Sequence, residues 1–324
     1  MKLPRRKFLH LAAGAAALPA LSRGARAQAY PSRPVRIMVG FAAGSASDIV
    51  ARLLGQLLSE RLGQPFVVEN RPGAGTNLAT EAVVRAPADG YALLMVASAN
   101  SITPTLYDRL NFNFIQDIAP IAGTNSNPYI MVVNPSLPAK TVPEFIAYAK
   151  TNPGKINMGS SGVGTVLHLS GELFKMMAGL DMVHVPNRSG GQLNDLIAGQ
   201  VQVVFSPLPI TVEQVRAGRL RALAVTSASR LEAMPDVPTL NEFLPGYETS
   251  GWNGVGAPKN TPAEIIEKLN KEINAGLASP GIKARFADLG LTALTGTPAD
   301  FGKFIAAETE KWGKVIRAAN IKAE

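Results

Sequence analysis

Residues 35–63 read VRIMVGFAAGSASDIVARLLGQLLSERLG, and this stretch decides the fold class. Its β-branched start predicts a strand over Val35–Gly40, and the leucine-rich part carries apolar residues at the i, i+4 and i+8 spacing of a helix that packs on a sheet. Gly63 stands where a helix-ending glycine is expected. A strand, a loop of small residues and a helix form the basic unit of an α/β fold.

Short β-branched runs alternate with helical periods along the rest of the chain, which indicates an α/β fold with largely parallel sheets. The strands and helices between residues 129 and 226 are expected to be inserted into a first domain that resumes near Trp252. We therefore expect two lobes joined by two crossings of the chain, with residues 30–129 and 251–324 in the first lobe and residues 130–250 in the second. The predicted strands are Val35–Gly40, Phe66–Glu69, Leu93–Ser98, Tyr129–Asn134, Ile156–Ser160, Met182–Val185, Val201–Phe205, Leu220–Thr226 and Trp252–Ala257.

The charge of the chain argues against nucleic acid as a partner. The formal net charge is +8, but six of the 32 basic side chains and none of the 24 acidic ones lie in residues 1–28. The remaining chain is nearly neutral, which does not suit binding to a phosphate backbone. The absence of cysteine excludes disulfides, thiolate nucleophiles and cysteine-ligated metal sites.

The first 29 residues have the features of an export signal. Arg5 and Arg6 precede a short apolar stretch, Leu11–Leu21, and Ala25–Ala29 offers two overlapping A-x-A cleavage sites. The arginine pair resembles a twin-arginine signal, and an ordinary secretory signal is the alternative. Both interpretations predict a periplasmic protein.

The sequence contains few side chains suited to catalysis. After residue 29 the only histidines are His168 and His184. His168 and Glu172 have i, i+4 spacing, but a zinc site needs a third ligand, so a packed histidine is favoured over a metal ligand. Val163 breaks the G-x-S-x-G pattern of a serine nucleophile, and the common dinucleotide and nucleoside triphosphate motifs do not occur. We expect no metal, no cofactor and no catalytic residues.

Two loops of small residues point to binding instead. Residues 40–48 join the first strand to the first helix, and residues 160–165 occupy the equivalent position in the second unit. The first amides of a helix have no intrahelical partner, and the helix dipole favours negative charge, so amides near Gly44–Ser47 and Gly162–Thr165 are expected to hold a carboxylate. The alternative for each loop is a tight turn, in which Ser45 and Asp48 form a capping box.

Several short motifs follow one another along residues 30–324. They are Arg33–Arg36, Gly44-x-x-x-Asp48, Val68–Gly75, Ala88–Tyr91, Ser160-Ser161-Gly162-x-Gly164-Thr165, His184–Pro186 and Met234–Thr239. In this order they resemble the Bug family, the periplasmic solute receptors of tripartite tricarboxylate transporters. The resemblance implies a two-lobed periplasmic binding protein of the type II kind, with two mixed or parallel sheets flanked by helices, that holds an organic acid between its lobes.

The resemblance assigns ligand-binding residues on both lobes. Asp48 has two interpretations, a capping acid or an acceptor for a ligand hydroxyl or amine. The sequence departs from the family pattern at Val163, at Asn187 in place of tyrosine and at Ser206 in place of aspartate, which leaves the specificity open. The expected positions are Phe41, Gly44, Ser45 and Asp48 on the first lobe and Ser161, Gly162, Gly164, Thr165, Asn187 and Ser206 on the second.

The leading hypothesis is a monomeric, non-enzymatic receptor that delivers a small carboxylate to membrane permease subunits. A receptor of the same fold that signals to a histidine kinase is the second hypothesis. A periplasmic hydrolase is the third, and the missing catalytic triad weakens it.

Overall fold

A computed structural model describes residues 30–187, 191–231 and 234–323. The predicted export signal lies outside these residues. The strands are β1 (Val35–Val39), β2 (Phe66–Asn70), β3 (Ala92–Ala97), β4 (Ile118–Val133), β5 (Asn157–Ser160), β6 (Val183–Pro186), β7 (Val203–Pro207), β8 (Arg221–Val225), β9 (Ser250–Pro258) and β10 (Thr292–Ala293). The helices are α2 (Ala46–Leu62), η1 (Ala74–Thr76), α3 (Asn77–Val84), α4 (Ser98–Leu106), α5 (Phe114–Asp117), α6 (Val142–Thr151), α7 (Val166–Ala178), α8 (Gln192–Ile197), α9 (Leu208–Arg216), η2 (Leu240–Glu242), α10 (Ala263–Leu277), α11 (Pro280–Asp288) and α12 (Pro298–Ala318).

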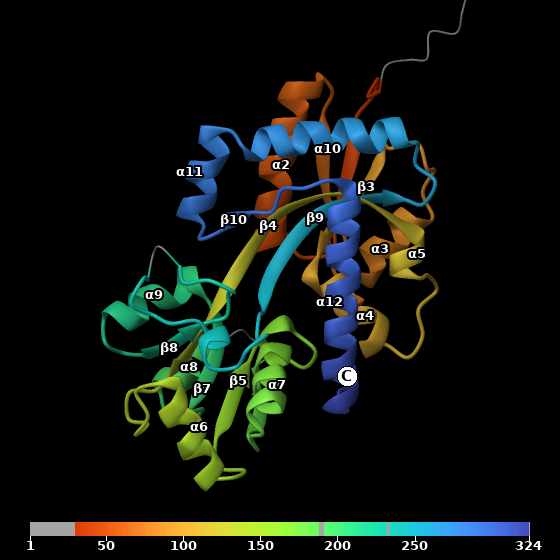
Figure 1. The fold of residues 1–324 in the computed structure, drawn as a ribbon. Coiled ribbons are helices and arrows are strands. Elements are labelled where there is room, and N and C mark those ends of the chain that lie inside the picture. Colours follow the sequence, from red (N-terminus) through yellow and green to blue (C-terminus); the bar gives the residue numbers. More distant parts are fainter. Residues whose placement is uncertain (1–29, 188–190, 232–233, 324) are drawn as a thin grey trace, which may run out of the picture.

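The strands form one mixed sheet in the order β2-β1-β3-β9-β4-β7-β5-β6, with β8 and β10 paired to β4. We call the part around β1, β2 and β3 the upper half and the part around β5 to β8 the lower half (Figure 1). In each half, parallel strands are flanked by helices, because strands buried on both faces need cover on both sides. These features confirm the predicted α/β fold.

Strands β4 and β9 connect the two halves. β4 pairs with β9 from Ile118 to Pro128, and from Tyr129 onward it pairs with β7 instead. The sequence predicted only the second part of β4. The first part was not predicted, because its prolines, glycine and polar residues have low strand propensity. The ladder takes up this irregular composition through register shifts on either side of Gly123.

The C-terminal helix α12 adds a connection that the sequence analysis did not predict. Its first turns pack Phe301 and Ile305 into the core of the upper half. Its last turns pack Trp312, Val315 and Ile316 into the main core of the lower half. Figure 1 shows α12 running alongside β9 toward α7. The two halves are therefore linked by β4, by β9 and by the packing of one helix.

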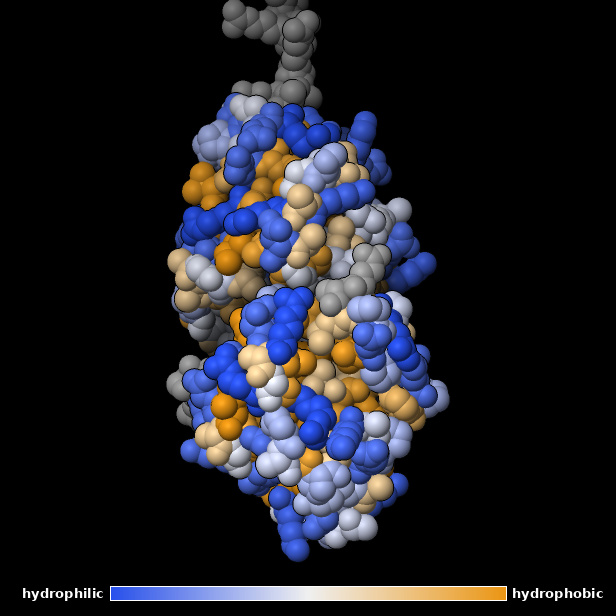
Figure 2. Space-filling model, turned by 90° about the vertical axis from the view of Figure 1, so that its left-hand side faces the viewer, coloured by the Kyte–Doolittle hydropathy of each residue, from blue (hydrophilic) through white to orange (hydrophobic). Residues whose placement is uncertain are grey.

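The surface carries a mixture of polar and apolar residues. Hydrophilic side chains cover most of the face drawn in Figure 2, and apolar ones form smaller patches between them. Within the described ranges, no helix has the length and apolar character needed to cross a membrane.

Candidate functional site

A hollow of about 370 Å³ lies between the two halves, and we call it the cleft. The upper half contributes Phe41 and the start of α2, the start of α4, and residues of β9. The lower half contributes Ser161, Leu167 and Pro207, and Tyr129 stands where β4 passes from one half to the other. Residues far apart in the sequence thus meet at the carboxyl ends of parallel strands, which is where ligands bind in open α/β sheets.

Four helices begin at residues that line the cleft. Ser45, Ala46 and Ser47 are the cap and first two residues of α2, and Ala97 and Ser98 are the corresponding start of α4. Leu167 is the second residue of α7, and Pro207 immediately precedes α9. First-turn amides have no acceptor within their own helix, so these helix starts direct partial positive charge into the cleft.

Among the residues that the structure describes, the side chains that line the cleft carry no formal charge. Two arginines of the upper half are engaged in ion pairs. Arg52 pairs with Asp48 at 2.9 Å, and Arg71 pairs with Glu69 at 2.6 Å. Arg188 lies outside the described residues. Within the described part of the chain, an anion in this cleft would meet helix starts and neutral polar groups such as Asn127 and Asn253.

Asp48 organises the loop that precedes α2. Its carboxylate accepts hydrogen bonds from the Gly44 amide at 2.8 Å, from Arg52 Nε at 2.9 Å and from Asn70 Nδ2 at 2.8 Å. Ser45 Oγ in turn accepts the Asp48 amide at 3.3 Å. Asp48 is buried and does not line the cleft. It is therefore a loop-holding residue, and Ser45 caps α2 without the reciprocal bond of a capping box.

Low pH is expected to destabilise the loop that Asp48 holds. Burial raises the pKa of Asp48, but the hydrogen bonds from Arg52, Gly44 and Asn70 outweigh burial and set the pKa at about 2, below the ordinary 3.8. Because the folded pKa is the lower one, the ionised carboxylate stabilises the fold above about pH 4, and this contribution is lost as the pH falls from 3.8 to about 2. We expect Asp48→Asn to be less stable at neutral pH and to lack this part of the acid dependence. Melting temperatures measured at stepwise lower pH test it, and equal acid slopes for the two proteins would contradict it.

Hydrogen bonds to nearby side chains also fix the loop of the lower half, residues 160–165. The Gly162 amide donates to Ser160 Oγ at 3.1 Å, and the Gly164 amide donates to His168 Nδ1 at 3.1 Å. Thr165 caps α7 by accepting the His168 amide. Gly164 has a φ of +73°, and a Cβ there would lie 2.4 Å from Leu106 Cδ2 of α4, so only glycine fits this contact.

The ten expected site residues fall into two groups. Phe41, Ser45 and Ser161 line the cleft, and the other seven do not. The structure differs from the expectation most clearly at Gly44, Gly162 and Gly164, whose amides already have partners inside the protein. The first amides of α2 and α7, which have no acceptor within their own helix, lie two residues after Gly44 and Gly164, at Ala46 and Val166.

The remaining expected residues have structural partners. Asn187 Nδ2 donates to Asp195 at 2.6 Å, and Ser206 is buried with its hydroxyl accepting from Thr211 at 2.7 Å. Sequence reasoning missed Trp252 and Asn253 as lining residues. The signal was present, because they lie at one of the two predicted crossings, and a crossing borders the space between the lobes.

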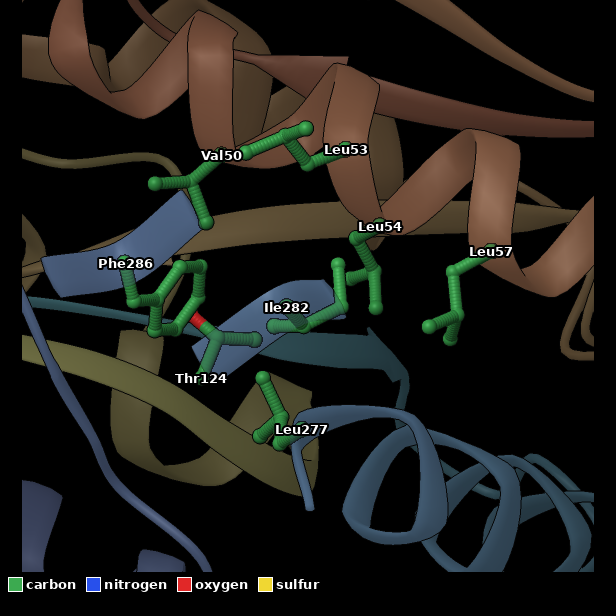
Figure 3. A pocket seen from close by; sticks show the side chains of 8 residues that line it. All are labelled: Val50, Leu53, Leu54, Leu57, Thr124, Leu277, Ile282 and Phe286. Carbon is green, nitrogen blue, oxygen red and sulfur yellow. The ribbon is translucent and has the colours of Figure 1, made fainter. Parts of the chain in front are cut away.

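A second hollow, drawn in Figure 3, is a gap in the core. Its side chains come from α2, β4, α10 and α11 and point toward one another, and they are apolar apart from Thr124. Its volume of about 10 Å³ is close to the minimum needed for a single water. Within the part of the chain that the structure describes, no group of three metal-ligating side chains is found.

The comparisons with known proteins identify the family. The model of the tripartite tricarboxylate transporter family receptor matches residues 50–321. The chain belongs to this family. The family's members are solute-binding receptors, so the predicted non-enzymatic receptor is confirmed.

Relatives and solved structures agree over nearly the whole length. The receptor is 35% identical to protein BugT of Bordetella pertussis (strain Tohama I) over 300 residues, which cover 91% of this chain and 92% of BugT. The R. palustris protein Rpa4515, solved with adipate, has 36% identity and a TM-score of 0.77 over 90% of this chain and 99% of its own. MatC (Rpa3494) from Rhodopseudomonas palustris with bound malate has 30% identity and a TM-score of 0.73 over 89% and 100%.

Proposed function

We propose that the receptor holds a small organic acid in the cleft, with a carboxylate against the main-chain amides that begin α2, α4 and α7. The observation that carries this proposal is the convergence of helix starts on a cleft whose described lining residues carry no formal charge. A helix start binds an anion without a cationic side chain, and each such interaction contributes up to about 2 kcal/mol when partly buried.

The rest of the lining fits the body of such an acid. Phe41, Leu167 and Trp252 supply apolar surface from both halves, and Ser161 and Asn253 supply neutral polar groups. A carbon chain can pack on the apolar residues while its polar ends meet helix starts and hydroxyls. The acids named for two related structures, adipate and malate, support a small carboxylate as the ligand class.

A thermal-melting panel tests this function. We expect acids of this class, beginning with adipate and malate, to raise the melting temperature in a concentration-dependent way, since a ligand that binds only the folded state stabilises it. The diamine with the carbon skeleton of adipate is the matched control, because it keeps the chain length and reverses the charge. A shift with the diamine and none with any mono-, di- or tricarboxylate would contradict the proposal.

The cellular setting extends the same proposal. We infer that residues 1–29 direct export by the twin-arginine route, that the mature monomer works in the periplasm and that it delivers its acid to permease subunits. The lobes, residues 30–129 with 251–324 and residues 130–250, close about the crossings on β4 and β9 when the acid binds. No observation on this molecule favours a sensor kinase as the partner.

A further inference from the structure

Two histidines form a stacked pair behind the binding loop of the lower half, which comprises residues 160–165. His168 on α7 and His184 on β6 have ring centroids 3.5 Å apart and ring planes 11° apart. His168 is only 4% exposed. The function of a solute receptor does not itself require this pair, so its place in the fold needs a separate explanation.

Each ring is connected to one glycine of the loop. His168 Nδ1 accepts the Gly164 amide at 3.1 Å. His184 Nε2 lies 2.6 Å from Ser160 Oγ, and the same oxygen accepts the Gly162 amide at 3.1 Å. Ser161, which lines the cleft, lies between Ser160, which contacts His184, and Gly164, whose amide donates to His168. The histidine pair therefore fixes the loop on both sides of a cleft residue.

The contact to Gly164 exists in one protonation state. An amide N–H can donate only to an imidazole nitrogen that carries a lone pair, so the proton of neutral His168 is on Nε2. That nitrogen faces Glu172 Oε1 at 3.5 Å. A second proton on the ring would occupy Nδ1 and would place two donors against each other. Protonation of His168 is therefore incompatible with the bond that holds Gly164.

We propose that His168 and His184 are positioning residues for the binding loop, and that protonation of His168 on acidification releases the loop and weakens binding of the organic acid. The release of the loop stands on the geometry alone. The effect on affinity rests on the proposed function.

Burial and the surrounding charges keep His184 neutral in mild acid. Among the described residues, the charged groups that face the pair are Glu172 and Lys175 of α7, which pair with each other at 2.9 Å. Helix α12 presents the apolar residues Trp312, Val315 and Ile316 to this region. Burial, the neighbouring His168 and Lys175 lower the pKa of His184 to about 4, although Glu172 acts in the opposite direction. His184 therefore stays neutral in mild acid, so the proposed release acts through Nδ1 of His168, which holds the Gly164 amide.

Amide exchange in the ligand-free receptor tests the release of the loop. Protein labelled with ¹⁵N-glycine gives a protection factor for the Gly164 amide, which we expect to fall at least tenfold between about pH 7.5 and about pH 5. In His168→Asn, the side-chain oxygen replaces Nδ1 as the acceptor and does not titrate, so protection should stay constant. In His168→Leu it should be low at both pH values. The Gly179 amide, which bonds to Lys175 at the other end of α7, controls for unfolding of the helix.

Calorimetric titration with adipate tests the effect on binding. We expect wild-type affinity to fall about tenfold over the same pH range, as loss of one hydrogen bond implies, and the affinity of His168→Asn to change little. Equal pH dependence of Gly164 protection in wild type and His168→Asn would overturn the proposal, and so would protection that does not depend on pH in the wild type. If adipate and the other acids give no binding to the wild type at any pH, the proposed function fails, while amide exchange still decides the role of the histidines.

Discussion

Replacing Ala46 with proline is expected to lower the affinity for a bound acid by roughly 10- to 100-fold while the fold remains intact. Ala46 is the first residue of α2 and lines the cleft, and its amide has no acceptor within the helix. If that amide donates to the carboxylate, its removal deletes a charge-assisted hydrogen bond of about 1.5–3 kcal/mol.

The backbone at this position is suited to proline. The first position of a helix tolerates proline well, because the missing N–H makes no intrahelical bond and the fixed φ matches the helix. Proline also requires an extended residue before it, and Ser45 has φ −67° and ψ 161°. The Ala46 side chain is exposed, so the proline ring has space. Loss of binding in this variant would thus report on one amide.

Titration calorimetry with the acid that gives the largest melting shift measures the effect. Ala46→Ser is the matched control, because it keeps the amide and changes only the side chain, and it should bind like the wild type. An unchanged melting temperature of ligand-free Ala46→Pro shows that the fold is intact. Wild-type affinity in Ala46→Pro would show that the start of α2 does not hold the anion.

The sequence predicted the fold well where its signal is local. The strand, loop and helix of residues 35–63 follow from β-branched residues, small residues and leucine spacing, and the structure has all three. The first half of β4 was missed because its strand conformation comes from pairing with β9 and not from its own residue types.

The site was predicted at the level of loops and not of atoms. Both loops do border the cleft, but the amides of Gly44 and Gly164 are occupied by Asp48 and His168. Both partners lie four residues further along the chain, yet spacing alone does not say whether an acid or an imidazole folds back onto the loop. Trp252 reaches the cleft through β-sheet pairing over a long sequence separation, so the sequence indicated it only by its position at a predicted crossing.

Replacing Glu308 with alanine is expected to destabilise the receptor by about 2–5 kcal/mol, since each buried group left unsatisfied costs about 1–3 kcal/mol. Glu308 Oε2 accepts the indole N–H of Trp252 and that of Trp312, each at 3.1 Å, and its other oxygen pairs with Lys311. Glu308 is 7% exposed, and both indoles are buried. Its removal leaves two buried donors without an acceptor.

The change acts on the connection between the halves. Trp252 lies on β9 at the cleft, whereas Trp312 packs in the main core of the lower half, so one carboxylate on α12 joins the cleft wall to the lower half. Thermal unfolding measures the loss, and the tryptophan emission reports on both indoles directly, because the chain has only two tryptophans.

Glu310→Ala is the matched control on the same helix. Its pair with Lys314 is exposed and should leave stability unchanged. Equal melting temperatures for Glu308→Ala and Glu310→Ala would show that the indole contacts do not stabilise the link. A drop confined to Glu308→Ala, with changed emission, would identify α12 as a structural part of the cleft wall.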